Sequence, residues 1–75
     1  MPELTTKIRE HRFRAGLKQE ELADIVGVRR ETIARLERGM YNPSLKLAMD
    51  IAKVFNVTVE SIFQFDEDAK YDSNL

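Results

Sequence analysis

Apolar residues recur at helical spacing along most of the chain, and the pattern is clearest between residues 19 and 38. At about 100° per residue, four apolar positions of QEELADIV share one helix face: Leu22, Ala23, Ile25 and Val26. Gly27 follows where a left-handed C-cap would end that helix. The next segment has only a narrow apolar seam, Ile33 and Leu36. The pattern therefore predicts a helix, a tight turn and a second helix.

Three more helices are predicted around this pair. The first runs from an N-cap at Thr5 or Thr6 to about Ala15. Ser44 begins another helix, to Phe55, and Thr58 begins a short last one. The inward positions expected in the helix after Ser44 are Leu45, Leu47, Ala48, Ile51, Ala52, Val54 and Phe55. Apart from a brief alternation at 62–65, no strand pattern appears, so the expected fold class is all-α with five helices.

The chain of 75 residues has the length of one small domain. We place this domain at residues 1–65, with its helix-turn-helix unit at about 19–38. Residues 66–75 are polar, acidic and poor in apolar side chains, so we expect a flexible tail there.

Several classes of protein are excluded by composition. The chain has no Cys, so it has no disulfides and no thiolate metal site. Neither a long apolar run nor a leader is present, so we expect a cytoplasmic protein with no membrane contact. One His, and no glycine-rich phosphate loop, argue against an enzyme. We expect no metal and no cofactor.

Charge is divided unevenly along the chain. The formal net charge is -1, but residues 1–46 carry ten Lys and Arg against seven Asp and Glu. Residues 47–75 carry two against six. Electrostatic affinity depends on the local field rather than on the net charge of the chain. Residues 1–46 can therefore bind a polyanion such as DNA although the chain as a whole is slightly acidic.

The second helix of the central pair carries a polar arc opposite its apolar seam. That arc holds Arg30, Glu31, Ala34, Arg35 and Arg38. A narrow apolar seam opposite several guanidinium groups is typical of a helix whose exposed side binds a ligand. We therefore expect the segment Arg30–Arg38 to enter the major groove of double-stranded DNA.

The stretch LKQEELADIVGVRRETIARLERGMYNPSLKLAMDIAKVFNVTVESIF resembles the Cro/repressor, or XRE-type, helix-turn-helix family. The resemblance covers about Ile8 to Phe63. The sequence pattern typical of the family is Gln19, Ala23 and Gly27, followed at fixed offsets by Ile33, Leu36, Glu37 and Gly39. It implies a compact five-helix, lambda-repressor-like DNA-binding domain.

The resemblance also assigns roles to individual residues. Gln19 matches a phosphate contact. The positions that match base-reading residues are Arg30, Glu31, Ala34 and Arg35. Those that match contacts to flanking phosphates are Arg38, Tyr41 and Asn42. Arg12 and Glu37 match a partly buried salt bridge, so we assign this pair to structure.

Lys18 and Arg29 stand where the family has Ser or Thr as N-caps. A cation at the positive end of a helix is unfavourable unless a phosphate lies nearby. We therefore predict that both contact phosphate; the alternative is that they are ordinary surface charges.

Arg30 is the first candidate to read guanine, since a guanidinium can donate two parallel hydrogen bonds to O6 and N7. Arg35 is the second. Glu31 could accept from cytosine N4, or it could orient Arg30 or Arg35; the sequence does not separate these two roles.

Proteins of this kind bind as two-fold dimers with half-sites one helical turn apart. We expect a homodimer whose contact is made by Ile62, Phe63 and Phe65. The alternative is that Phe63 only seals the monomer core.

The function predicted is that of a sequence-specific transcriptional regulator, a repressor, bound to a two-fold operator. The alternative is a protein-interaction module of the same fold, an antitoxin or a coactivator-like protein, with its protein partner at the acidic C-terminal end. The basic residues at 29, 30, 35 and 38 favour DNA.

Overall fold

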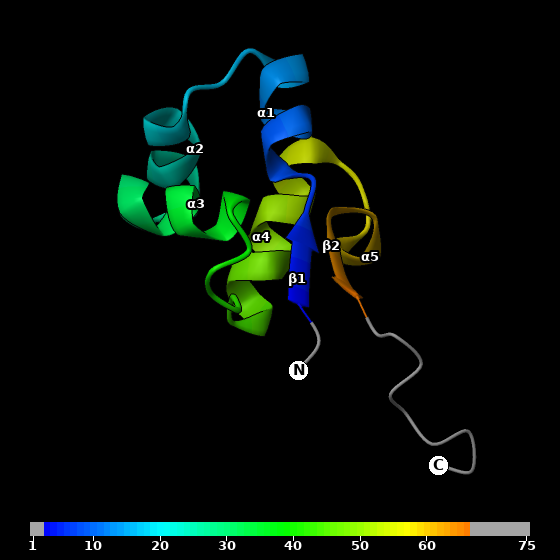
Figure 1. Cartoon of the computed structure of the whole chain (residues 1–75). Coiled ribbons are helices and arrows are strands. Elements are labelled where there is room, and N and C mark those ends of the chain that lie inside the picture. Colours follow the sequence, from blue (N-terminus) through cyan, green and yellow to red (C-terminus); the bar gives the residue numbers. More distant parts are fainter. Residues whose placement is uncertain (1–2, 67–75) are drawn as a thin grey trace, which may run out of the picture.

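The computed structural model describes residues 3–66, which form five helices and a two-stranded sheet (Figure 1). The elements are β1 (Glu3–Thr6), α1 (Ile8–Ala15), α2 (Gln19–Val26), α3 (Arg30–Glu37), α4 (Leu45–Phe55), α5 (Val59–Ile62) and β2 (Phe63–Asp66). The predicted five helices are present and the fold is predominantly helical, but it is not strictly all-α, because it also contains this small sheet. Asp66 belongs to β2, and residues 67–75, where we expected a tail, lie outside the described residues.

The sheet joins the two ends of the described chain. β1 and β2 pair antiparallel, with Leu4 opposite Phe65 and Thr6 opposite Phe63. The Lys7 N–H continues the pairing by donating to the Ile62 carbonyl at 2.9 Å. Thr5 and Thr6 are therefore strand residues rather than the N-cap of α1, and Lys7 occupies that cap position.

Every helix contributes to one core. The largest fully buried side chains are Ile8 of α1, Leu22 of α2, Ile33 and Leu36 of α3, Ile51 of α4 and Ile62 of α5. α3 is held by its two seam residues, as the sequence predicted, and its opposite side remains open to solvent.

Two residues that were expected to face inward are exposed. Ile25 is 57% exposed and Leu45 is 74% exposed. Residues two positions apart lie about 160° apart around a helix. The burial of Ala23 therefore keeps Ile25 away from the centre of the buried face of α2, and the burial of Leu47 does the same for Leu45 in α4.

Local capping determines where the helices begin and end. The Leu47 N–H donates to Ser44 Oγ at 3.1 Å, and the Ser61 N–H donates to Thr58 Oγ1 at 3.2 Å. Asn56 takes the left-handed conformation at the end of α4 with φ of 56°. The caps at Ser44 and Thr58, predicted from the sequence, are confirmed. Among residues 3–66, no helix is long and apolar enough to span a membrane.

Candidate nucleic-acid interface

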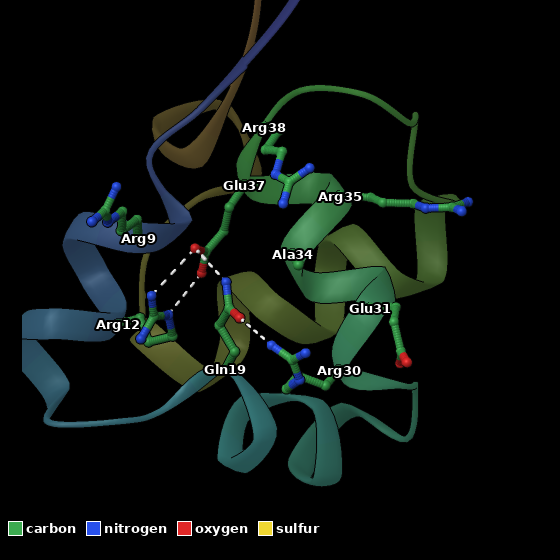
Figure 2. A pocket seen from close by; sticks show the side chains of 9 residues that line it. All are labelled: Arg9, Arg12, Gln19, Arg30, Glu31, Ala34, Arg35, Glu37 and Arg38. Atoms are coloured by element: carbon green, nitrogen blue, oxygen red, sulfur yellow. Dashed lines mark hydrogen bonds and ion pairs between the residues drawn. The ribbon is translucent and has the colours of Figure 1, made fainter.

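The outer side of α3 borders a surface hollow of about 550 Å³, which α1 and α2 complete. Figure 2 shows the side chains that line it: Arg9, Arg12, Gln19, Arg30, Glu31, Ala34, Arg35, Glu37 and Arg38. All four predicted base-reading residues are in this set. α3 thus presents its polar arc to an open concave surface.

At the floor of the hollow, Arg12 and Glu37 form the expected salt bridge. Arg12 Nε donates to Glu37 Oε2 at 2.7 Å, and Nη2 donates to Oε1 at 3.2 Å. The third Arg12 bond, from Nη1, goes to the Leu17 carbonyl at 3.0 Å. The two side chains are only 9% and 7% exposed. Because the buried charges are paired and hydrogen-bonded, they tie α1 to the end of α3.

Gln19 connects this salt bridge to the start of α3. Its amide Nε2 donates to Glu37 Oε1 at 3.1 Å, and its Oε1 accepts from Arg30 Nη1 at 3.1 Å (Figure 2). A guanidinium has five N–H donors, so Arg30 keeps most of its donors for another partner. The side chain expected to read a base is therefore positioned by α2.

The other residues of the arc extend outward from α3. Glu31 and Arg35 are exposed, and in Figure 2 both point away from the Arg12–Glu37 pair. Among the side chains of residues 4–65, neither salt bridge involves Glu31. The structure therefore offers no contact for the idea that Glu31 orients an arginine.

The hollow is cationic although the whole chain is not. Arg12 and Glu37 neutralise each other. The remaining charged lining residues are Arg9, Arg30, Arg35 and Arg38 against Glu31. A concentration of guanidinium groups on one concave face attracts polyanions, whatever the net charge of the chain.

Lys18, Arg29, Tyr41 and Asn42 do not line the hollow, although all four are exposed. Lys18 and Arg29 occupy the N-cap positions of α2 and α3, and neither side chain makes a cap bond. An amino or guanidinium group cannot accept a hydrogen bond, so only the Glu21 half of a capping box forms. There the Lys18 N–H donates to Glu21 Oε1 at 2.8 Å.

Arg9 is the lining residue that the sequence reasoning missed. It belongs to α1, three residues before Arg12. Residues three apart on a helix are neighbours on its surface. Once Arg12 was assigned to a contact with α3, that spacing was the available signal for Arg9.

Comparison with known proteins agrees with this geometry. Residues 7–62 match a family model described as helix-turn-helix. The chain belongs to the XRE-type helix-turn-helix family. α2, the turn at Gly27 and α3 form the motif that gives the family its name.

Relatives extend over most of the chain. An uncharacterized HTH-type transcriptional regulator of Archaeoglobus fulgidus is 60% identical over 65 residues, covering 87% of this chain and 92% of that protein. The cryptic phage CTXphi transcriptional repressor RstR of Vibrio cholerae is 31% identical, covering 95% of this chain and 63% of the repressor. The crystal structure of the restriction-modification controller protein C.AhdI from Aeromonas hydrophila superposes with a TM-score of 0.66 at 33% identity, covering 72% and 82% of the two chains.

Together these matches identify a transcriptional regulator with a DNA-binding helix-turn-helix fold. The protein is accordingly a non-enzyme. The hollow beside α3 is the candidate DNA interface.

Proposed function

We propose that this protein is a repressor that binds a two-fold DNA operator as a homodimer, with α3 in the major groove. The observation that carries the proposal is the position of Arg30. It begins α3, it is exposed, and Gln19 holds one of its N–H groups. A fixed guanidinium at the start of a helix suits a bidentate bond to guanine O6 and N7.

The other residues of the arc allow α3 to make several different kinds of contact with bases. The Glu31 carboxylate can accept a hydrogen bond from cytosine N4. Its negative charge makes a position near a phosphate unfavourable. Ala34 allows close approach and an apolar contact with a thymine methyl group. Arg35 lies one turn beyond Arg30 and provides a second guanine donor.

The proposed phosphate contacts surround this surface. Arg38 borders the hollow at the far end of α3. Lys18 and Arg29 lie at the N-termini of α2 and α3, where free backbone N–H groups and the helix dipole also favour an anion. Gln19 retains one amide N–H beyond its bond to Glu37, and Tyr41 and Asn42 follow α3 in the exposed loop. These contacts fix the orientation of the domain without specifying sequence.

The homodimer is proposed to form through the C-terminal end of the domain. Phe63 is half-buried and Phe65 is 49% exposed, so both retain apolar surface. Ile62 is fully buried in the monomer core and is withdrawn from the predicted contact. Two copies related by a two-fold axis would present their α3 helices to half-sites about 34 Å apart.

Repression is proposed because one relative, RstR, is named as a transcriptional repressor. Occupation of an operator is sufficient to exclude other proteins from the same DNA. We also propose a cytoplasmic location, which is consistent with membership of a family of DNA-binding regulators.

Arg30→Ala should weaken binding to the preferred operator by about 1–3 kcal/mol and relax the preference at one base position in each half-site. The operator is first selected from random duplexes, and affinities are then measured on a panel with every base at each position. Arg29→Ala is the matched control, since the two arginines are adjacent and both exposed. Loss of Arg29 should weaken binding to all sequences equally.

Equal weakening across the panel by Arg30→Ala would contradict base reading by Arg30. If the unaltered protein does not bind random-sequence duplex DNA even at 50 mM salt, where non-specific binding is strong, the proposed function itself fails.

A further inference from the structure

Phe13 is an aromatic residue that the proposed function leaves unexplained. It lies on α1 and is 61% exposed. Two guanidinium groups lie over its ring, with the Arg12 Cζ at 4.8 Å and the Arg9 Cζ at 5.3 Å from the ring centroid. These distances are within the range of cation–π attraction.

The two arginines differ in what else holds them. Arg12 is fixed by its bonds to Glu37 and to the Leu17 carbonyl. The Phe13 ring therefore packs on an immobile group and is restrained by it. In contrast, Arg9 takes part in neither of the salt bridges among the side chains of residues 4–65. Its charge is held over the ring and is not neutralised by an acidic side chain of those residues.

Arg9 lines the same hollow as the reading face of α3. In Figure 2 it projects from α1, on the side of the Arg12–Glu37 pair away from Glu31 and Arg35. The major groove is about 12 Å wide and admits a single helix. With α3 in the groove, cations on a neighbouring helix meet the sugar–phosphate backbone at the groove edge.

We infer that Arg9 contacts a backbone phosphate beside each half-site and that Phe13 is the residue that positions it. This inference rests on the proposed function, because it requires α3 to bind DNA. The ligand is a phosphodiester oxygen, so the contact adds affinity without sequence preference. Holding Arg9 on the ring reduces the side-chain freedom lost when the phosphate binds.

The test compares Arg9→Ala with Arg14→Ala in salt-dependent binding to the selected operator and to random duplex DNA. Arg14 is the matched control because it is an exposed arginine of the same helix that does not line the hollow. For Arg9→Ala, the slope of log affinity against log salt should decrease by about 0.9 per protomer. Affinity should fall by the same factor on both DNAs. Arg14→Ala should leave the slope unchanged.

Equal slopes for the two variants would overturn the phosphate contact, because Arg9 would then act only as one of many surface charges. A loss by Arg9→Ala that is restricted to one base position would also overturn it. Both outcomes presuppose that the unaltered protein binds DNA, so they are distinct from a failure of the proposed function.

Positioning by Phe13 is tested with Phe13→Leu, which keeps an apolar side chain over Arg12 but removes the ring. It should weaken operator binding roughly two- to fivefold in the otherwise unaltered protein, because an Arg9 side chain that is no longer held on the ring loses more conformational freedom when it binds phosphate. It should have no effect in the Arg9→Ala background. The same loss in both backgrounds would overturn the positioning role, and urea unfolding of each variant checks that the fold is retained.

Discussion

Replacing Glu37 with glutamine should destabilise the fold by about 3–5 kcal/mol, the cost of removing one partner of a buried ion pair. The Arg12 side chain is only 9% exposed, and Glu37 supplies the acceptors for its Nε and Nη2 atoms. Glutamine has nearly the same shape but no charge, so Arg12 would remain buried as an uncompensated cation. Equilibrium unfolding in urea measures the loss as a decrease in the midpoint.

A matched control comes from the exposed ion pair on α4. Lys46 Nζ lies 2.7 Å from Asp50 Oδ2, but the lysine side chain is 86% exposed. Asp50→Asn should therefore change stability by no more than about 0.5 kcal/mol. Replacing both buried partners, as Arg12→Met with Glu37→Leu, should recover most of the loss. A loss below about 1 kcal/mol for Glu37→Gln alone would contradict the account of a buried, paired charge.

Gly39→Ala should cost roughly 2–4 kcal/mol, the second-largest effect on stability, through two separate causes. Gly39 has φ of +70°, in the left-handed region that L-residues avoid. A Cβ built on it would also overlap the Leu4 carbonyl oxygen. That oxygen is backbone of β1, so it cannot turn aside as a flexible side chain would. β1 therefore approaches the end of α3 so closely that only glycine fits.

Gly27→Ala separates the two causes. Gly27 has a similar φ of +76°, but a Cβ there would meet nothing within 4 Å. Its substitution should cost only the conformational term, about 1–2 kcal/mol. Equal losses of stability for the two variants, measured by urea unfolding, would show that the close approach of β1 adds nothing to the cost of Gly39→Ala.

The helices could be predicted because their signals are local. Ser44 and Thr58 each cap the helix that follows by accepting a hydrogen bond from the backbone N–H three residues ahead. Gly16, Gly27 and Asn56 take the left-handed conformation at helix ends. The sheet could not be predicted in this way. β1 and β2 have only four residues each, and they lie at opposite ends of the described chain. Such short strands are stabilised by their pairing and by the burial of Leu4, neither of which is evident from periodicity.

The same distinction between local signals and long-range packing applies to the candidate site. The arc of α3 and the Arg12–Glu37 pair followed from helical spacing together with the family resemblance. The bond from Gln19 to Arg30 and the inclusion of Arg9 depend on how α1 and α2 pack against α3. Exposure at the edge of an apolar face, as at Ile25 and Leu45, also depends on the neighbouring helices.

Methylation of guanine N7 by dimethyl sulfate on the bound operator tests the central proposal most directly. Guanine N7 faces the major groove, whereas adenine N3, which the reagent also methylates, faces the minor groove. We predict that the protein protects guanine N7 in two clusters about one helical turn apart and leaves adenine N3 reactive. Protection of adenine N3 with guanine N7 still reactive would contradict the insertion of α3 into the major groove.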